Sequence, residues 1–329
     1  TIKKVKSLMK NRFKVPGELH ERPWVDFSHN RNEALEIAET KADYVMFMDA
    51  DDIFQAEKNF NLDFLLNDNF SAYNSRFTLN GIEFERTLFV NSLRGWRYEG
   101  VLHEFLKLQG DDNFFNQIGV APNCQVCANA SPLKRASTEK EKDLNAAKVL
   151  EEALKEDPEN CRYKFYLAQS YSDAKLYEKA IETYEDRVAM GGWDQEVYVS
   201  MYRISCLRQL IEEDKDQFLK DLTRAWEYMP NRFEAAAAIM NILIEEGRNS
   251  MAFSYGEMTI KFQRALGPRG DLFSISDAEN FVFPKNYAIA AEKCGFPQIA
   301  IQALKLLKET GGDNIIMAEL DRKSTLMKS

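Results

Sequence analysis

Arg162-Tyr-Lys-Phe-Tyr-Leu-Ala-Gln-Ser-Tyr171 is followed, after a short break, by Leu176-Tyr-Glu-Lys-Ala-Ile-Glu-Thr-Tyr184. In the second stretch, Tyr177, Ala180, Ile181 and Tyr184 recur every three or four positions, which places them on one face of a helix. We therefore expect two neighbouring helices that pack against each other, the second of them amphipathic.

The same pattern of helices separated by short breaks continues toward the end of the chain. Helix-breaking residues recur at Asp157-Pro158, Gly191-Gly192, Met229-Pro230 and Gly247. Between these breaks, apolar residues again follow helical spacing: Phe218, Leu222, Ala225, Trp226 and Met229, then Phe233, Ala236, Ala237 and Met240. This pattern predicts amphipathic helices stacked in pairs.

The pair of stretches at 162–184 resembles one tetratricopeptide repeat, with small alanines where the helices cross. The corresponding alanines Ala180, Ala225 and Ala252 lie 45 and 27 residues apart, which departs from the family period of about 34. We expect a degenerate tetratricopeptide-like helical domain over residues 136–329, with an ordinary irregular helical domain as the alternative.

Residues 1–135 mix short strand-like runs with turns. Residues 31–40 have helical composition, and residues 44–48 form a short apolar run typical of a strand buried on both faces of a sheet. Residues 71–79 and 85–90 read as two strands joined by the turn Asn80-Gly81. We therefore expect an α/β domain that contains a hairpin and ends near residue 135.

Composition limits the function. The net charge of −9 argues against a nucleic-acid partner, because phosphate contacts need clustered Lys and Arg. Apolar runs fall far short of the roughly 20 residues that cross a bilayer, so we expect no transmembrane segment, and without a signal peptide a cytoplasmic location. Five scattered cysteines indicate no disulfide framework. The spacing of Cys124 and Cys127 leaves two alternatives open: a redox or metal-binding role, or an ordinary surface or semi-buried pair without such a role.

Three aspartates, Asp49, Asp51 and Asp52, follow the predicted strand at 44–48. Open α/β sheets bind ligands beyond the carboxyl ends of their strands. Clustered carboxylates there suit Mg²⁺ or Mn²⁺, which bridges protein to a diphosphate. The alternative is that these residues only cap a turn or the next helix.

Further segments stand in a specific order around this cluster. They are Asp26-Phe-Ser-His-Asn-Arg-Asn32, residues 44–52, Gly95-Trp-Arg-Tyr-Glu-Gly-Val-Leu-His-Glu104, and, in the second half, Tyr163-Lys-Phe-Tyr-Leu-Ala-Gln-Ser-Tyr171, Arg187, Gly191-Gly-Trp193 and Glu196-Val-Tyr198. In this order they resemble the family 2 glycosyltransferases of the GT-A fold that carry C-terminal tetratricopeptide-like repeats. The resemblance implies a GT-A-like, Rossmann-like α/β nucleotide-sugar domain at 1–135, before the repeats at 136–329.

The resemblance also implies roles for individual residues. Asp49 would touch the ribose or the metal, and Asp51 would bind the metal that bridges the donor's diphosphate. Arg31 and Asn32 would line the nucleotide side, where a guanidinium complements phosphate charge. His103 would be a further metal or phosphate contact.

Glu104 is the catalytic base that the resemblance implies, with backbone hydrogen bonding as its alternative. Trp96 and Tyr98 would stack on sugar or, equally well, belong to the core. The implied activity is an inverting transfer that depends on Mn²⁺ or Mg²⁺. The donor would be a nucleoside diphosphate sugar, and we expect it to be UDP-linked. The acceptor would be a peptide, protein or glycan.

Two departures from the family pattern support a second hypothesis. The family begins with a strand and an Asp-x-Gly-Ser turn that binds the base, whereas Thr1 follows directly after the place of that turn, so we expect the first strand to be missing. No histidine lies at 125–129, where relatives often carry one. The second hypothesis is a non-catalytic helical-repeat scaffold or binding protein with a degenerate glycosyltransferase domain.

Overall fold

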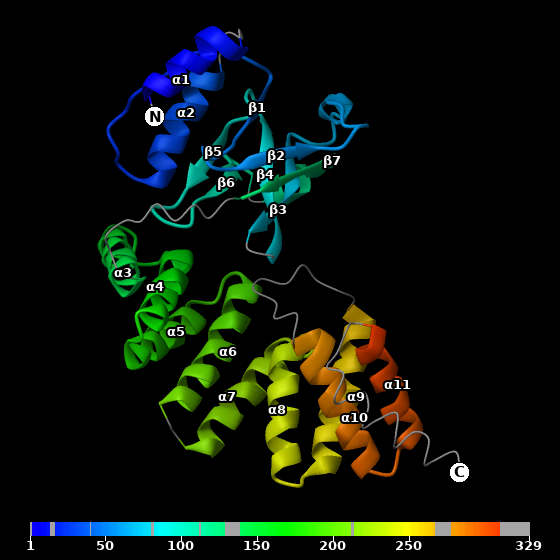
Figure 1. Ribbon diagram of the computed structural model, residues 1–329. Coiled ribbons are helices and arrows are strands. Elements are labelled where there is room, and N and C mark those ends of the chain that lie inside the picture. Colours follow the sequence, from blue (N-terminus) through cyan, green and yellow to red (C-terminus); the bar gives the residue numbers. More distant parts are fainter. Residues whose placement is uncertain are drawn as a thin grey trace. The chain divides into compact units, whose positions relative to one another are not determined.

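The computed structural model describes residues 2–13, 17–39, 41–79, 82–111, 113–128, 139–211, 214–266 and 278–309. The chain divides into two compact units, residues 1–136 and 137–329 (Figure 1).

The first unit is rich in strands. It opens with helix α1 (Ile2–Leu8) and a π-helical turn, η1 (Met9–Phe13), followed by α2 (Phe27–Glu39). The strands are β1 (Tyr44–Met46), β2 (Ile53–Ala56), β3 (Ala72–Leu79), β4 (Ile82–Asn91), β5 (Trp96–Glu99), β6 (Phe105–Leu108) and β7 (Ile118–Cys127). Two 3₁₀ turns, η2 (Asp63–Leu66) and η3 (Phe114–Gln117), lie between them.

Five of these strands form one sheet in the order β1-β4-β3-β7-β2, and β5 and β6 form a separate two-stranded sheet. Strands β3 and β4 pair antiparallel with Leu79 opposite Ile82, which confirms the predicted hairpin. The turn residues Asn80 and Gly81 themselves lie outside the described residues. Only the pairing of β3 with β7 is parallel; the β1–β4 and β2–β7 pairs are antiparallel.

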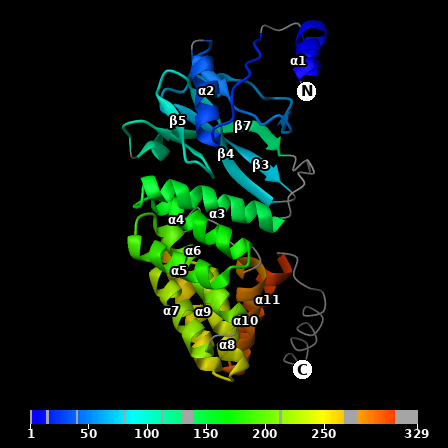
Figure 2. The ribbon, with the colours of Figure 1, turned by 90° about the vertical axis from the view of Figure 1, so that its left-hand side faces the viewer.

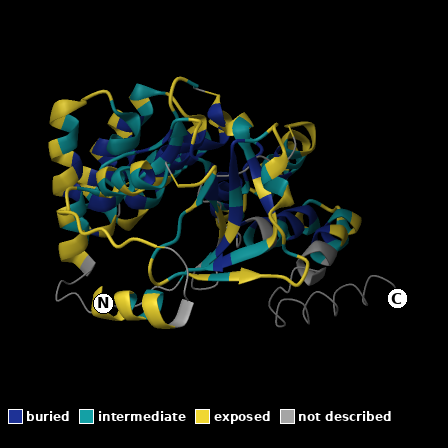
Figure 3. Cartoon of the chain, turned by 90° about the horizontal axis from the view of Figure 1, so that it is seen from above, coloured by how far each residue is buried: buried dark blue, intermediate teal, exposed yellow. Residues whose placement is uncertain are grey.

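Apolar side chains cover both faces of this sheet. On one face, Leu35 of α2 packs with residues of the sheet and of the β5–β6 hairpin, including Val90 and Trp96. On the other face, no α-helix of the described residues joins the core cluster; this face is covered by the segment before β3, through Phe60 and through Phe64 of η2. Figure 3 shows the buried stretches of the strands in dark blue.

This arrangement corrects the predicted fold class. The helix before residues 44–48 is present as α2, but the strand that follows it is a three-residue edge strand paired only with β4. Tyr44 and Val45 are half-buried and Met46 is 41% exposed, so this strand is less buried than its composition predicted. After β1, the described chain runs from strand to strand without an α-helix to make parallel crossovers. A Rossmann-like GT-A fold is therefore not evident in this unit.

The second unit is helical throughout its described residues. Its α-helices are α3 (Glu139–Glu156), α4 (Cys161–Asp173), α5 (Tyr177–Met190), α6 (Asp194–Leu210), α7 (Lys215–Tyr228), α8 (Phe233–Glu245), α9 (Asn249–Leu266), α10 (Phe283–Lys293) and α11 (Pro297–Glu309), with the π-helical turn η4 (Ala278–Val282) before α10. Each helix packs on the next along the chain, and Figure 2 shows them stacked side by side.

The predicted helix breaks are confirmed. Asp157-Pro158 lies between α3 and α4, Gly191-Gly192 between α5 and α6, Met229-Pro230 between α7 and α8, and Gly247 between α8 and α9. Gly191 and Gly247 have φ of 67° and 73°, in the left-handed region where glycine ends helices without strain. Asn160 begins α4 by accepting a hydrogen bond from the backbone N–H of Tyr163 at 3.0 Å.

The irregular alanine spacing has a structural explanation. Ala180, Ala225 and Ala252 are all fully buried in second helices of pairs, α5, α7 and α9. Ala180 and Ala252 are each the fourth residue of their helix, 72 residues apart, which is two periods of 36. Ala225 is the eleventh residue of α7, where Phe218 holds the fourth position. The repeat is therefore tetratricopeptide-like, and Ala225 is not equivalent to the other two alanines.

Candidate functional site

The start of α2 fixes the residues expected to bind a nucleotide. Asp26 precedes the helix, and its carboxylate accepts hydrogen bonds from the backbone N–H of His29 at 2.7 Å and the hydroxyl of Ser28 at 3.0 Å. This is N-capping, which satisfies an otherwise unpaired N–H of the first turn. Asn30 holds the preceding segment, donating to the Pro23 carbonyl at 2.8 Å and accepting from the Val25 N–H at 2.9 Å.

Asn32 ties α2 to strand β5. Its amide nitrogen donates to the carbonyl of Tyr98 at 2.9 Å, and its amide oxygen accepts from the N–H of Tyr98 at 2.8 Å. Both functions of the amide are thus directed at one backbone residue. The structure places Asn32 as a link between helix and strand, with both groups of its amide engaged by the backbone of Tyr98.

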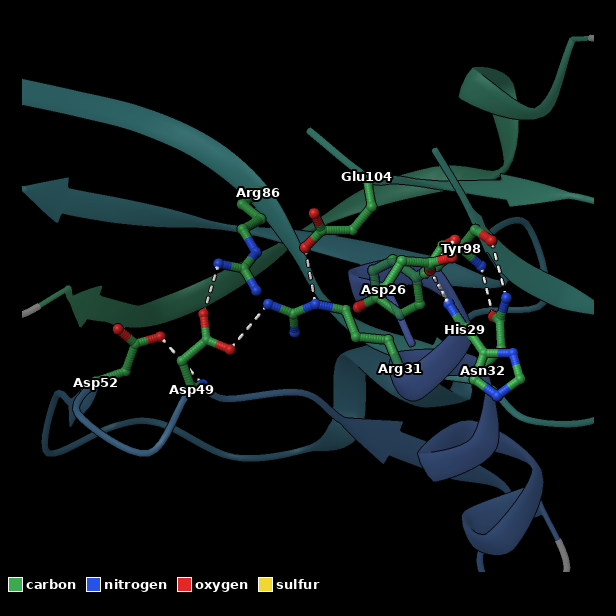
Figure 4. A network of polar contacts seen from close by, with 10 residues as sticks. Asp26, His29, Arg31, Asn32, Asp49, Asp52, Arg86, Tyr98 and Glu104 are labelled. Atoms are coloured by element: carbon green, nitrogen blue, oxygen red, sulfur yellow. Dashed lines mark hydrogen bonds and ion pairs between the residues drawn. The ribbon is translucent and has the colours of Figure 1, made fainter. Parts of the chain in front are cut away.

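Arg31 is the centre of an ionic network (Figure 4). Its Nε donates to Glu104 at 2.8 Å, and its Nη2 donates to Asp49 at 2.9 Å. The second carboxylate oxygen of Asp49 accepts from Arg86 of β4 at 3.3 Å. The guanidinium of Arg31 also lies over the ring of Tyr98, 5.5 Å from its centroid. The structure therefore brings together Arg31, Asp49 and Glu104 from three distant segments, and adds Arg86.

The charges of this network offset one another. Burial would raise the pKa of Asp49, but the guanidiniums of Arg31 and Arg86 outweigh it and hold that pKa below its ordinary value. For Arg31, burial acts to lower the pKa, yet Asp49, Tyr98 and Glu104 raise it overall. The pair therefore stays ionised over the whole range of ordinary pH.

Asp51 and Asp52 lie in the turn after Asp49. Asp49 and Asp52 close this turn, since the N–H of Asp52 donates to the Asp49 carbonyl at 3.1 Å and the Asp52 carboxylate accepts from the Asp49 N–H at 3.3 Å. Burial, with the charge of Asp49, raises the pKa of Asp52. Asp51 is exposed. Asp52 therefore caps this turn, which was the alternative to a metal-binding role.

The segment that carries His103 and Glu104 is a tight connection between β5 and β6. Gly100 has φ of 110°, and a Cβ there would lie 3.2 Å from the carbonyl oxygen of Leu102, so only glycine suits this position. His103 is exposed and also has a left-handed φ, 54°. The turn delivers Glu104 to Arg31, with 15% of the glutamate side chain exposed.

Trp96 and Tyr98 belong to the core. Trp96 is 1% exposed, donates to Ser71 Oγ at 3.3 Å and meets Phe114 edge-on. Tyr98 is 7% exposed and packs edge-on against Phe47, and burial raises the pKa of its phenol to about 12. Stacking on a sugar needs an open ring face, so the core alternative describes both residues.

The expected divalent metal does not fit this arrangement. Both oxygens of Asp49 already face guanidiniums, which a cation would have to displace against charge repulsion. Among the described residues, which include Asp49, Asp51, His103 and the pair Cys124 and Cys127, no group of three or more His, Cys, Asp or Glu side chains is placed to hold a metal ion. The expectation of a manganese-binding Asp-x-Asp motif is corrected accordingly.

A second ionic network, in the helical unit, was missed from the sequence. Arg187 of α5 is fully buried and donates to Glu196 of α6 at 2.9 Å and to the carbonyl of Gly191. Arg162 of α4 reaches the other oxygen of Glu196 at 3.3 Å. Arg187 and Glu196 entered the sequence analysis only through the family resemblance, because two positions on different helices carry no local signal of pairing.

A related cluster surrounds Arg232, directly before α8. Its guanidinium donates to Glu234 at 2.6 Å and to Gln195 of α6 at 2.7 Å, and it lies 4.4 Å from the ring centroid of Tyr198. Since Gln195 and Glu196 are neighbours, the two networks meet at the start of α6. The first network joins α4, α5 and α6, and the second joins α6 to the start of α8, which is a structural role.

Comparisons with known proteins were made against families, curated proteins and solved structures. No family model matches the chain, and no curated protein matches it. Among solved structures, MamA shares 20% identity over 56% of this chain and 95% of that chain, with a TM-score of 0.38. YrrB, described as a tetratricopeptide-repeat protein with an unusual peptide-binding site, shares 16% over 55% and 84%, with a TM-score of 0.37. A thermophilic tetratricopeptide-repeat protein of Thermus thermophilus shares 16% over 54% and 87%, with a TM-score of 0.35.

The fold of the first unit and the ion pairs of Asp49 correct the predicted function. The resemblance implied an inverting, metal-dependent glycosyltransferase, but the sheet is mainly antiparallel and Asp49 is paired with two arginines. The alternative of a non-catalytic helical-repeat protein agrees better with them. The nucleotide-sugar donor, the absence of a nucleic-acid partner and the cytoplasmic location stay predictions.

None of the helices in the described part of the chain is long and apolar enough to cross a membrane.

Proposed function

We propose that the chain is a non-catalytic binding protein whose helical-repeat unit holds a peptide segment of a partner protein. The observation that carries this proposal is a set of polar side chains on the first helices of three successive pairs. Gln169 of α4 is partly exposed, and Arg203 of α6 and Asn241 of α8 are exposed. Each lies in the second half of its helix.

Gln169 and Asn241 hold equivalent positions in the repeat. They are 72 residues apart, the same separation as Ala180 and Ala252. An amide side chain carries a donor and an acceptor in one plane, which matches the peptide group of an extended segment. Stacked repeats present such side chains at regular intervals along one surface.

The strand-rich unit supports the non-catalytic part of the proposal. The residues best suited to chemistry there, Arg31, Asp49 and Glu104, form ion pairs with one another or with Arg86. Asn32 directs its amide at the backbone of Tyr98. These contacts hold α2, the turn after β1 and the β5–β6 hairpin together, which gives each polar residue a structural role.

Peptide selection with the full chain tests the proposal. Phage-displayed random peptides would be selected on the immobilised protein, and the affinity of the selected peptides measured by fluorescence anisotropy. We expect Gln169→Ala and Asn241→Ala each to weaken binding about 5- to 10-fold, the loss of roughly one hydrogen bond. Gln209→Ala, which removes an exposed amide in the last turn of α6, is the matched control and should leave binding unchanged.

Two results would overturn the proposal. One is that selected peptides bind all three variants as tightly as the unchanged protein, which would place the binding surface elsewhere. The other is turnover of a nucleotide sugar by the purified chain that Asp51→Asn abolishes.

A further inference from the structure

Helix α9 carries an apolar stripe on its exposed side. The stripe consists of Met251, Tyr255, Met258, Phe262 and Leu266, spaced by four, three, four and four residues. At 3.6 residues per turn these positions fall within about 80° of arc. Four of them are well exposed, at 45% for Met251, 38% for Met258, 40% for Phe262 and 49% for Leu266.

This stripe differs from the outward face of the equivalent helix α5. The exposed residues in the body of α5 are charged, as expected for a face in water, and include Glu182, Glu185 and Asp186. Both helices are second members of their pairs and bury an alanine at their fourth position. The apolar surface of α9 is therefore not a requirement of the repeat.

The stripe rests on a fixed aromatic layer. Trp226 of α7 is 8% exposed and donates its Nε1–H to Thr259 Oγ1 at 2.8 Å. Its ring meets those of Tyr255 and Phe262 edge-on, with centroids 4.9 and 6.3 Å apart. These contacts hold the rings in place, so a partner would meet a preorganised surface.

We propose that this stripe is the contact between two copies of the chain, with α9 packed antiparallel on α9 of the second copy. The spacing of the stripe is nearly the same read in either direction. With Met251 placed opposite Leu266 of the second copy, Tyr255 falls opposite Phe262 and Met258 lies beside the two-fold axis. The stripe can therefore cover itself in a two-fold contact, which is the commonest form of self-association.

The charged side chains of α9 lie to one side of the stripe. Lys261 is the nearest of them, about 60° round the helix from Met258. Glu257 lies about 100° from Met258 and accepts a hydrogen bond from the hydroxyl of Tyr287 on α10. The two-fold pairing therefore brings no like charges together across the stripe.

The size of the stripe predicts a weak dimer. Covering the exposed parts of its side chains would bury about 400 Å² per copy and about 800 Å² in total, at the low end for specific interfaces. We therefore expect self-association in the micromolar range.

Sedimentation velocity of the full chain tests the proposal, over a range of about 1 to 200 μM that brackets such an affinity. The unchanged protein should pass from monomer to dimer across it. Met258→Glu puts two like charges beside the two-fold axis and should raise the dissociation constant at least about tenfold. Leu210→Glu is the matched control, since Leu210 is 62% exposed in the same unit but outside the stripe, and it should dimerise normally.

Cysteine cross-linking tests the register independently, and decides the question if Met258→Glu does not fold. Under mild oxidation, Met258→Cys should give a disulfide-linked dimer, and the double variant Met251→Cys with Leu266→Cys should do the same. Met251→Cys alone and the unchanged protein should not. A chain that is monomeric at every concentration, or a dimer that survives Met258→Glu, overturns the proposal; so does capture of a different helical partner on a stripe that never self-associates.

Discussion

Replacing Arg31 with methionine removes the centre of the network in the strand-rich unit while keeping a side chain of similar length. It deprives Glu104 of its ion pair and leaves Asp49 with Arg86 alone. The side chains of Arg31 and Glu104 are 18% and 15% exposed, between a surface pair and a fully buried one. Breaking fully buried pairs costs about 3–5 kcal/mol and surface pairs about 0–1, so we expect a loss of about 2–3 kcal/mol.

Hydrogen exchange measured by mass spectrometry reports this loss locally. Amides of α2 and of the β5–β6 hairpin should exchange about 30 to 150 times faster in the variant, because each 1.4 kcal/mol corresponds to about tenfold. The helices of the second unit serve as an internal reference and should not change. Adding Glu104→Gln to Arg31→Met should recover about 1–2 kcal/mol, since the glutamate then no longer lies uncompensated.

Arg22→Met is the matched control. Arg22 lies 3.7 Å from Glu33 and is 46% exposed, so its loss should change the stability by no more than about 0.5 kcal/mol. If Arg31→Met accelerates exchange no more than Arg22→Met does, the network does not hold the unit together and the reasoning is refuted.

Three further predictions concern charge and packing. Because the pKa of Asp49 is lowered in the folded protein, the stability that its ionised form contributes is complete above the ordinary carboxyl value of 3.8 and is lost as the pH falls through the lower folded-state value. The free energy of unfolding of Asp49→Asn should therefore fall less steeply with acidification than that of the unchanged protein. An equally steep fall would contradict the pairing. Glu196→Gln leaves the buried Arg187 without a counter-charge and should cost about 3–5 kcal/mol in urea unfolding of the helical unit, whereas a loss below about 1 kcal/mol would show that the pair is dispensable. Gly256→Ala should lower thermal stability by about 1–3 kcal/mol despite alanine's better helix propensity, because its Cβ would overlap the ring of Tyr287; an unchanged or raised melting temperature would contradict the packing.

The helical unit was predictable because its signals are local. Proline and glycine breaks mark helix ends within a few residues, and the buried faces of α5, α7 and α8 follow helical spacing. The repeat period was harder to predict, because Ala225 looks equivalent to Ala180 of α5 in the sequence but lies in a later turn of its own helix, α7. Only the helix boundaries show that Ala180 and Ala252 hold equivalent positions in the repeat.

The strand-rich unit shows where composition misleads. Residues 44–48 are apolar throughout, which normally indicates a central strand, yet β1 lies at an edge with Val45 and Phe47 packed on one core cluster and Tyr44 and Met48 on the other. Nothing local reveals which neighbours a strand will have. Nor does local sequence reveal that an aromatic segment, around residues 60–64, covers one face of the sheet.

The ordered motifs around Asp49 located a real cluster but not its chemistry. Arg31, Asp49 and Glu104 do meet, since the helix, the turn and the hairpin that carry them pack together. Whether these residues could bind a ligand depends on Arg86, which no motif included and which donates to the second carboxylate oxygen of Asp49. Asn32 likewise binds the backbone of a residue 66 positions away, a contact that no local pattern announces.

Isothermal titration calorimetry of the purified chain with UDP, with and without Mn²⁺, tests most directly the claim that this cluster is structural. The paired Asp49 predicts no metal-dependent heat of binding, and the same trace for the unchanged protein and for Asp51→Asn. Saturable binding of UDP that requires Mn²⁺ and disappears in Asp51→Asn would contradict that claim.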